Sequence, residues 1–378
     1  MKNLRFILII VLISLSYNNG IIAKDNFRPG KLWFDTSKKI INAHGGGILK
    51  YNGIYYWFGE HKAENTNNAT VGINCYSSKN LLDWDYCGVA LSVSDKVGND
   101  IENGCIMERP KVVFNKKTNT FVMWFHLELK GKGYATAAYG VATSDNPSGP
   151  YTYKGHSRAN AGLYPVEMNK RDISVLDTLN IKNYPVWWTP TWREAVKKGL
   201  FLKRDFTVGQ MARDQTIFVD DDNKAYHIFS SEDNLTIHIA ELTDDYLNHT
   251  GRYTRVAAGG QNEAPTIFKR DGIYWMITSG CTGWSPNAAR LFKANSIWGP
   301  WTQLGNPCIG DNANTTFDGQ GTYILKIDDK DNYIFMADKW RPDNPIDGRY
   351  IWLPIQFKDN QPFIEWKDSW NLHFFEKK

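Results

Sequence analysis

Hydrophobic residues, many of them aromatic, are concentrated in five stretches that each follow a turn. The stretches are GIYYWFGE (53–60), TFVMWFHLE (120–128), KAYHIFSSE (224–232), GIYWMITSG (272–280) and NYIFMADKW (332–340). Aromatic and β-branched residues in runs of this length favour β-strands. The turn pairs Asn52-Gly53 and Asp271-Gly272 are strong signals of β-hairpins. The pattern predicts five hairpins spread along the chain.

A shorter strand precedes each aromatic-rich stretch and begins with polar residues or glycines. The five starts are HGGGILKY from His44, ERPKVVFN from Glu108, RDQTIFVD from Arg213, EAPTIFKR from Glu263 and GQGTYILKI from Gly319. After its aromatic-rich stretch, each unit continues with further strands, as in RLFKANSIWGPWTQL at 290–304. This repeat predicts an all-β fold, a five-bladed β-propeller of four-stranded antiparallel blades.

In a propeller, the starts of the innermost strands surround one central pocket. We therefore expect Glu108, Asp214, Glu263 and Gln320 to meet there, although they lie far apart in the sequence. An N-terminal strand near Trp33 is expected to complete the last blade and remove an open sheet edge.

The spacing between units is stretched across residues 154–212, which predicts an inserted loop and helix segment. Within it, TWREAVKKG reads as a helix, with a capping box formed by Thr191 and Glu194. The same segment contains Trp187, Trp188 and Trp192, which are unusual for a solvated loop. Two interpretations are open: the insertion forms a wall of the central pocket, or it packs against the blades.

Composition allows a large core in one catalytic domain, expected over residues 24–378. Hydrophobic residues make up 42% of the 378-residue chain and aromatic residues 14%. Aromatic rings suit strands and also stack on the C–H faces of sugars. The net charge is +4 with mixed signs and no long basic run, so a nucleic-acid partner is not expected. We expect a monomer.

Residues 1–23 have the features of a secretory signal peptide. Lys2 and Arg5 precede an apolar run at 6–15, and Ala23 is a plausible cleavage residue. The apolar run is short for a bilayer span, so no membrane span is expected after cleavage. The protein is therefore predicted to be exported, to the periplasm or outside the cell.

The five cysteines show no CxxC spacing, which argues against a zinc site. Export permits disulfides, and Cys75 and Cys87 are placed to bridge neighbouring strands. Buried, inert thiols are the alternative. The sequence predicts no metal site and no cofactor.

Clustered acids in a central pocket suit glycoside hydrolysis, which needs a carboxylic acid to protonate the leaving oxygen. We predict Glu263 as this general acid and Asp214 as the carboxylate that orients it and raises its pKa. Ion pairing at a strand end is the alternative for both. Glu108 is predicted to activate water or bind substrate. Gln320 is predicted to form a hydrogen bond to water or a hydroxyl, because an amide oxygen is almost non-basic.

Substrate binding is expected from residues beside these acids. His44 heads the first blade and is assigned to substrate binding, with a structural role as the open alternative, and the glycines after it, beginning with Gly45, leave room for a ligand to approach. Arg109 and Arg213 adjoin Glu108 and Asp214, and we assign them to the substrate as well. A further residue, Trp284, in CTGWSPN, is the best candidate for stacking on a sugar ring.

The sequence resembles glycoside hydrolase family 43 over nearly all of the mature chain, and more closely its exo-β-1,3-galactanase branch. The stretches that carry the resemblance are AHGGGILKYNGIYYWFGEHK, MERPKVVFN, RDQTIFVDDDNKAY, LTDDYL, EAPTIFKRDGIYWM, TGWSPN and FDGQGTYIL. The resemblance implies a five-bladed β-propeller and an inverting mechanism, with Glu263 matching the acid and Asp214 the pKa modulator. Some members of the family hold calcium on the propeller axis.

Two departures from the family pattern accompany this resemblance. The position that usually holds the catalytic base falls near His44, Gly45 and Gly46, where there is no carboxylate. In the galactanase branch, a glutamine matching Gln320 has been proposed to act instead, and a glutamate matching Glu108 contacts the sugar. The insertion at 154–212 is the second departure, because that branch is more compact.

The resulting prediction is an exported, exo-acting glycoside hydrolase that takes an oligo- or polysaccharide, with galactan 1,3-β-galactosidase as the leading activity. An α-L-arabinofuranosidase or β-galactofuranosidase on the same fold is the first alternative. A non-catalytic sugar-binding propeller is the second.

Overall fold

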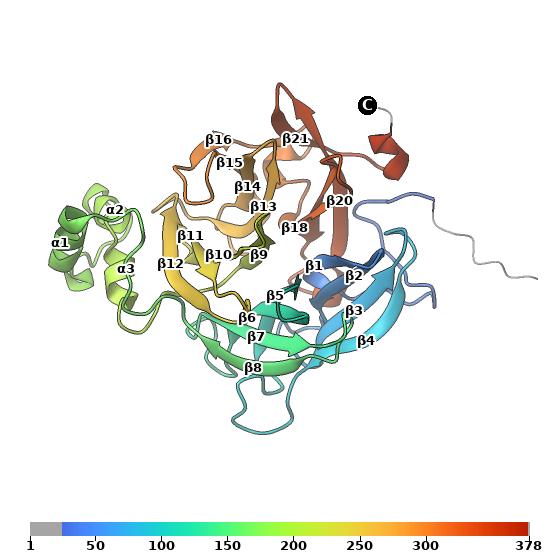
Figure 1. The fold of residues 1–378 in the computed structure, drawn as a ribbon, viewed down its shortest axis with the longest axis horizontal. Helices are drawn as coiled ribbons and strands as arrows, with labels where there is room; N and C mark the ends of the chain where they lie inside the picture. The colour runs from blue at the N-terminus through green and yellow to red at the C-terminus, as the bar shows by residue number, and fades with distance from the viewer. Residues whose placement is uncertain (1–24, 377–378) are drawn as a thin grey trace, which may run out of the picture.

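The computed structural model describes residues 25–376, which form a ring of five β-sheets around a central hub (Figure 1). The signal peptide predicted at 1–23 lies outside the described residues. Four sheets have four strands in chain order, and each is an antiparallel meander, since each strand pairs antiparallel with the next one along the chain. This confirms the five-bladed propeller predicted from the repeat.

The strands of the first three sheets follow the predicted units closely. The first sheet contains β1 (His44–Tyr51), β2 (Ile54–Glu60), β3 (Gly72–Ser78) and β4 (Asp85–Ser92). The second contains β5 (Ile106–Asn115), β6 (Thr120–Glu128), β7 (Ala138–Ser144) and β8 (Thr152–Ser157). The third contains β9 (Gln215–Val219), β10 (Ala225–Ser231), β11 (Thr236–Leu242) and β12 (His249–Val256).

The last two sheets complete the ring. The fourth contains β13 (Glu263–Arg270), β14 (Ile273–Ser279), β15 (Arg290–Ala294) and β16 (Thr302–Gly305). The fifth contains β18 (Gln320–Lys326), β19 (Tyr333–Lys339), β20 (Arg349–Lys358), β21 (Gln361–Glu365) and the short β17 (Cys308–Ile309). The innermost strands β1, β5, β9, β13 and β18 pack in sequence around the hub, with β18 returning to β1.

The outer edge of the fifth sheet differs from the prediction. Its extra strand is β17, which pairs in parallel with β21, whereas Trp33 lies outside every named strand. Trp33 instead packs its ring against Trp352, with 5.0 Å between ring centroids. The two ends of the described chain meet nearby, because Phe27 and Trp370 form an antiparallel bridge. An aromatic cluster therefore closes the ring where a strand was expected.

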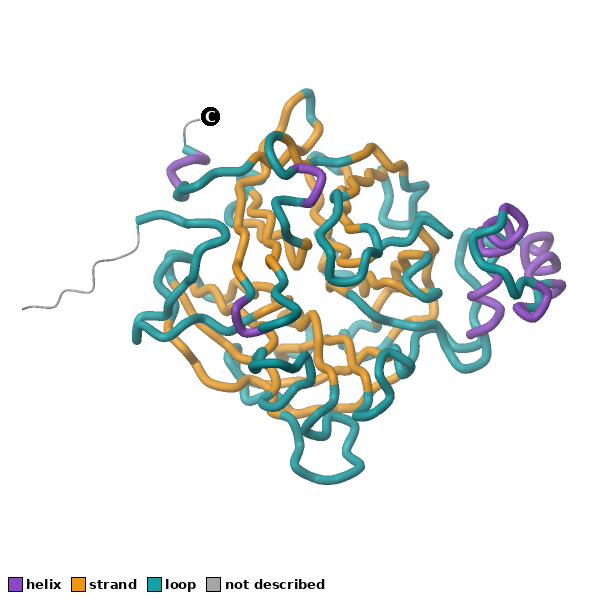
Figure 2. Tube along the Cα trace, turned by 180° about the vertical axis from the view of Figure 1, so that it is seen from behind, coloured by secondary structure: helices purple, strands orange, loops and turns teal. Residues whose placement is uncertain are grey.

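The insertion forms a small helical unit outside the ring of blades (Figures 1 and 2). It holds α1 (Lys170–Thr178), the 3₁₀ turn η1 (Ile181–Asn183), α2 (Pro190–Lys197) and α3 (Leu200–Asp205). A bridge between Ala159 and Gln210 closes its base. Only α2 was predicted, and its cap differs: Thr189 receives the N–H of Trp192, with Pro190 as the first helical residue. The capping box at Thr191 was wrong.

The insertion packs against the second and third blades. Leu176, Trp192 and Phe201 share one hydrophobic cluster with Trp124 and Tyr253 of those blades. This supports the packing interpretation, and none of the residues that line the central pocket belongs to the insertion. The pocket-wall interpretation was therefore wrong.

The remaining turns and thiols complete the fold. The short 3₁₀ turns η2 (Ala313–Thr315), η3 (Pro345–Asp347) and η4 (Leu372–Phe375) lie in the C-terminal part. All five cysteines are described and are free thiols; Cys75 on β3 and Cys87 on the neighbouring β4 are not joined. Among residues 25–376, no helix has the length and apolar character needed to cross a membrane.

Candidate active site

A pocket of about 340 Å³ opens at the hub, and all five blades contribute to its lining. Of the nine residues predicted for the site, seven line this pocket: Glu108, Arg109, Arg213, Asp214, Glu263, Trp284 and Gln320. His44 and Gly45 do not. The pocket also contains Glu60, Lys62, His126, Tyr134, Asn234, Gly283 and Trp340, which the sequence reasoning had not assigned.

A shared backbone irregularity turns the start of two inner strands toward the pocket. The pairing of β5 shifts between Glu108 and Lys111, and that of β13 shifts between Glu263 and Thr266. In each case the residue after the glutamate has a positive φ, 55° at Arg109 and 51° at Ala264. Such a bulge redirects the neighbouring side chain. The two glutamates therefore occupy equivalent positions in their blades.

Glu263 is the carboxyl whose surroundings best suit proton donation. Its Oε1 accepts a hydrogen bond from the Asn234 side chain at 2.7 Å. Burial, followed by the negative charge of Asp214, raises the pKa of Glu263 to about 7. A carboxyl with this pKa is protonated in a large fraction of molecules near neutral pH, as a general acid requires.

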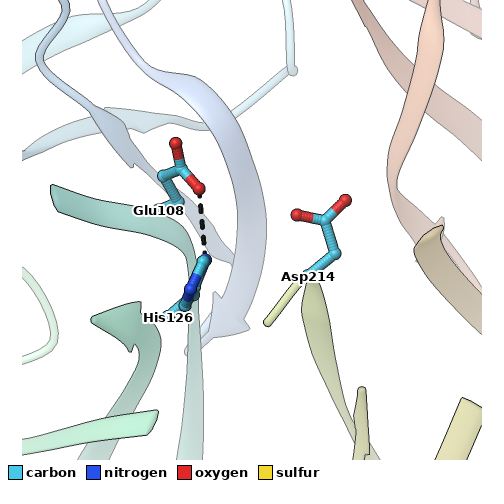
Figure 3. A group of neighbouring side chains, drawn as sticks. All are labelled: Glu108, His126 and Asp214. Carbon is cyan, nitrogen blue, oxygen red and sulfur yellow. Dashed lines mark hydrogen bonds and ion pairs between the residues drawn. The ribbon is translucent and has the colours of Figure 1, made fainter. Parts of the chain in front are cut away.

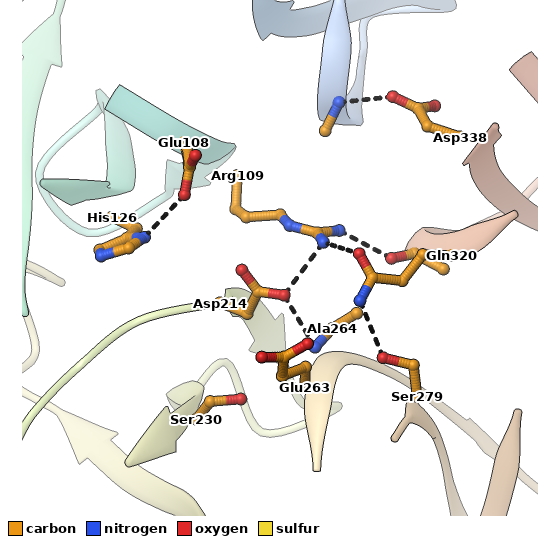
Figure 4. A network of polar contacts seen from close by, with 12 residues as sticks. Glu108, Arg109, His126, Asp214, Ser230, Glu263, Ala264, Ser279, Gln320 and Asp338 are labelled. Atoms are coloured by element: carbon orange, nitrogen blue, oxygen red, sulfur yellow. Dashed lines mark hydrogen bonds and ion pairs between the residues drawn. The ribbon is translucent and has the colours of Figure 1, made fainter. Parts of the chain in front are cut away.

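Asp214 connects the third and fourth blades (Figure 4). Its Oδ2 forms an ion pair with Arg109 at 3.0 Å and accepts the backbone N–H of Ala264, also at 3.0 Å. Because Ala264 follows Glu263 directly, this bond fixes the backbone that carries the candidate acid. Asp214 thus contributes both charge and position to Glu263.

Gln320 is held by three side chains, of which Figure 4 shows Arg109 and Ser279. Its Oε1 accepts hydrogen bonds from Arg109 at 2.5 Å and from the indole N–H of Trp340 at 2.9 Å, while its Nε2 donates to Ser279 Oγ at 2.9 Å. Two donors occupy the two lone pairs of the amide oxygen. Gln320 can therefore offer the pocket its second N–H, but no acceptor.

Trp340 is the most informative residue that the sequence analysis had left unassigned. Its ring lies 5.3 Å from the Arg109 guanidinium and 6.0 Å from the Trp284 ring. A signal was present in the sequence: Trp340 ends the aromatic stretch of the fifth unit, and antiparallel pairing brings that end beside the start of β18.

Glu108 belongs to a buried chain of polar groups. It bonds to His126 Nδ1 at 3.1 Å and accepts the Tyr134 hydroxyl at 2.8 Å, and the other nitrogen of His126 lies 2.9 Å from Glu128. Burial opposes a charge on His126, but the hydrogen bonds to Glu108 and Glu128 prevail and raise its pKa to about 9. Burial likewise acts to raise the pKa of Glu108, and His126 outweighs it, lowering that pKa to about 2. Glu108 is therefore a stable carboxylate facing the pocket.

Comparison with known proteins gives the same picture as the geometry. Residues 189–362 match the model of Glycosyl hydrolases family 43. A GH43 β-1,3-galactosidase solved with galactodeoxynojirimycin is 58% identical, with a TM-score of 0.90, over 92% of this chain and 100% of that one. The chain belongs to glycoside hydrolase family 43.

Two further relatives of this glycoside hydrolase differ in length. An exo-β-1,3-galactanase variant from Phanerochaete chrysosporium, solved with β-1,3-galactotriose, is 32% identical with a TM-score of 0.74, over 92% of this chain and 68% of that one. The β-D-galactofuranosidase xynD of Aspergillus niger is 31% identical over 129 residues, which are 31% of this chain and 37% of that protein.

The family suggests a cation on the axis, but the residues here do not fit one. The donor atoms of Glu108, His126 and Asp214 lie within 4.8 Å of one another (Figure 3). However, both nitrogens of His126 already bond carboxylates, and Asp214 is paired with Arg109. A protonated imidazole has no lone pair for a metal. This family 43 hydrolase uses the cluster as an internal ion-pair network.

The predictions for His44 and Gly45 were wrong. The His44 side chain is fully buried, its ring is stacked on Tyr350, and burial lowers its pKa to about 3. At Gly45, φ is +62°, and a Cβ would lie 2.1 Å from Glu60 Oε1. The glycine therefore makes room for a buried side chain of the enzyme rather than for a ligand.

The remaining predicted residues lie at the pocket as expected, with partners the sequence does not reveal. Arg213 donates to the carbonyl of Tyr134 at 2.9 Å, joining the second and third blades. Trp284 is 42% exposed, which leaves its ring accessible to a sugar. Below them, Lys62 and Glu60 form a buried ion pair at 2.5 Å, and Glu60 accepts the backbone N–H of Arg109.

Proposed function

We propose that this glycoside hydrolase is an exo-acting β-1,3-galactosidase that removes terminal galactose from β-1,3-galactan. The observation that carries the proposal is the placement of Glu263, with a pKa of about 7, in a pocket beside Asp214. The substrate comes from similarity, because the relative that is 58% identical over 92% of the chain is a β-1,3-galactosidase.

In the proposed reaction, a terminal sugar enters the hub pocket and stacks on Trp284. Glu263 protonates the departing glycosidic oxygen, while water attacks the anomeric carbon from the opposite face with inversion and releases its proton to the solvent. Asp214 keeps Glu263 protonated and oriented. Glu108, as a stable carboxylate, accepts a hydrogen bond from a sugar hydroxyl, and Gln320 donates its free N–H to a hydroxyl or to the water. Arg109 and Arg213 hold these groups and contact the substrate.

β-Galactofuranosidase activity is the second candidate, favoured by the match to xynD over 129 residues. The same assay separates the two activities. Purified enzyme is incubated with β-1,3-galactan and with p-nitrophenyl β-galactopyranoside, β-galactofuranoside and α-L-arabinofuranoside, and products are identified by chromatography. The proposal predicts free galactose from galactan as the main product. Release of sugar only from a furanoside would contradict it, and no release from any substrate would favour a sugar-binding propeller.

The cellular setting is part of the same proposal. We propose that residues 1–23 direct export and that residues 24–378 act as a single catalytic domain, as a monomer. The apolar run at 6–15 after Lys2 and Arg5 supports export. N-terminal sequencing of protein recovered from the producing cells, with light scattering of the purified enzyme, tests these points.

A further inference from the structure

The helical insertion carries two exposed tryptophans that the hub pocket does not use. Trp187 and Trp188 are 42% and 43% exposed, and they precede α2 in a run, 185–188, in which every residue is exposed. Apolar side chains that are exposed together in one patch often mark a binding surface. The unit that carries them lies outside the ring of blades, away from the hub (Figure 1).

The two rings are held rigidly by a buried third tryptophan. The Trp187 ring is stacked on Trp192 with 5.2 Å between centroids, and the Trp188 ring lies 4.9 Å from Trp192. Trp192 is only 1% exposed and packs in the core shared with the second and third blades. On the blade side, Arg255 of β12 donates to the carbonyls of Val196 and Lys197. The exposed rings are therefore pre-positioned.

The backbone of Trp188 adopts an unfavourable conformation that places its ring in this position. Its φ is +70°, in the left-handed region that bulky residues avoid. Such a conformation is energetically unfavourable for a bulky residue and is concentrated at functional sites. Glycine or asparagine would fit this position at lower cost, so packing alone does not account for a tryptophan there.

A planar hydrogen-bonding group lies over the Trp188 ring. The Arg193 guanidinium lies 5.4 Å from the Trp188 ring, and its Nε donates to the Trp188 carbonyl at 3.3 Å. Its two terminal nitrogens make no other hydrogen bond or ion pair within residues 25–376, and the residue is exposed. Aromatic faces bordered by free N–H donors match a sugar, which presents C–H groups on its faces and hydroxyls around its rim.

We propose that Trp187, Trp188 and Arg193 form a second carbohydrate site, which binds the polysaccharide chain away from the hub. The ring planes of Trp187 and Trp188 meet at 65°, with centroids 6.3 Å apart, so they fit consecutive sugars of a chain that turns between units. Exposed charged residues on α2, among them Arg193, Glu194 and Lys197, make the face unlike the apolar core of a protein interface. The ligand, a galactan chain, follows from the proposed function. The second site would bind this chain while the hub pocket cleaves its end.

Affinity electrophoresis through gels containing β-1,3-galactan tests the proposal. All variants carry Glu263→Gln so that the polymer is not degraded. Trp188→Asn relieves the strained φ, so we expect unchanged or higher Tm together with loss of most of the retardation. Val186→Ala, next to the pair and 65% exposed, should be retarded as strongly as its parent. Equal retardation of Trp188→Asn and parent would overturn the proposal, as would a Tm drop of several degrees with binding intact.

Kinetics of the active enzyme separate this proposal from the proposed function. Trp188→Asn should raise the KM for polymeric galactan about tenfold, the size expected when one stacking ring is lost, and leave hydrolysis of β-1,3-galactobiose unchanged. Galactobiose hydrolysis by the parent reports on the hub alone. A parent that cleaves galactobiose while Trp188→Asn leaves the polymer KM unchanged would refute the second site only. Concentration-dependent dimerisation abolished by Trp188→Asn would assign the face to a second copy of the chain and also refute it.

Discussion

Trp340 donates its indole N–H to the side-chain oxygen of Gln320 over 2.9 Å. Together with Arg109, this bond fixes which end of the amide faces the pocket, so that Gln320 presents an N–H and not an oxygen. The arrangement favours a glutamine that orients a hydroxyl or water by donation.

Trp340→Phe keeps an aromatic ring beside Arg109 but is smaller and lacks the indole N–H. We expect kcat to fall about tenfold with little change in KM, because the amide oxygen of Gln320 loses one of its two hydrogen-bond donors. Trp284→Phe is the matched control, since the Trp284 indole makes no hydrogen bond to Gln320. It should alter KM more than kcat. Full kcat in Trp340→Phe would show that the bond has no catalytic role.

Asp214→Asn tests the origin of the raised pKa of Glu263. The negative charge of Asp214 raises that pKa, so its removal lowers it and Glu263 loses its proton at lower pH. The alkaline limb of the kcat/KM profile, expected near pH 7 in the parent, should therefore move to lower pH by about one unit. Asparagine still accepts the Ala264 N–H, which keeps the backbone in place. If the alkaline limb of the profile stays at the same pH, the charge of Asp214 does not raise the pKa of Glu263.

Glu108→Gln removes the charge that faces the pocket. Turnover should fall at least about 100-fold, because a carboxylate held by His126 and Tyr134 is a stronger acceptor for a sugar hydroxyl than an amide. Tyr134→Phe removes one of these bonds and leaves the carboxylate, so its loss should be smaller. Near-normal turnover in Glu108→Gln, measured on galactobiose, would reduce Glu108 to a structural residue.

The His126 network predicts how stability depends on pH. The folded-state pKa of His126 is raised to about 9 from an ordinary 6.5. A raised pKa stabilises the fold fully below pH 6.5, and the contribution is lost as pH rises through 9. Wild-type Tm should therefore fall between pH 6.5 and 9.5 by about 5 °C more than that of His126→Gln. Parallel Tm curves for the two proteins would contradict a protonated His126.

The repeat could be predicted because the blades are built from local signals. Turn pairs such as Asn52-Gly53 and the strand patterns around them recur in each unit, and the fold class follows from their number. The convergence of Glu108, Asp214, Glu263 and Gln320 followed as well, because equivalent positions of a radial repeat meet at its axis.

Other features depend on contacts between blades, which no local pattern contains. Asn234 reaches Glu263 from a turn in which Glu232, Asp233 and Asn234 all have positive φ. The bulge after Glu108 is fixed by Glu60 of another blade, which accepts the Arg109 N–H. The helix α1 did leave a local signal, a capping box formed by Asn169 and Asp172.

The leaving-group dependence of Glu263→Ala shows whether Glu263 is the general acid. A general acid is needed for a poor leaving group such as a sugar and is dispensable for 2,4-dinitrophenolate, which departs without a proton. If Glu263 is the general acid, Glu263→Ala loses at least about 1,000-fold in kcat on β-1,3-galactobiose while retaining most of the parent rate on 2,4-dinitrophenyl β-galactoside. Equal losses on both substrates, or normal cleavage of galactobiose, would contradict it.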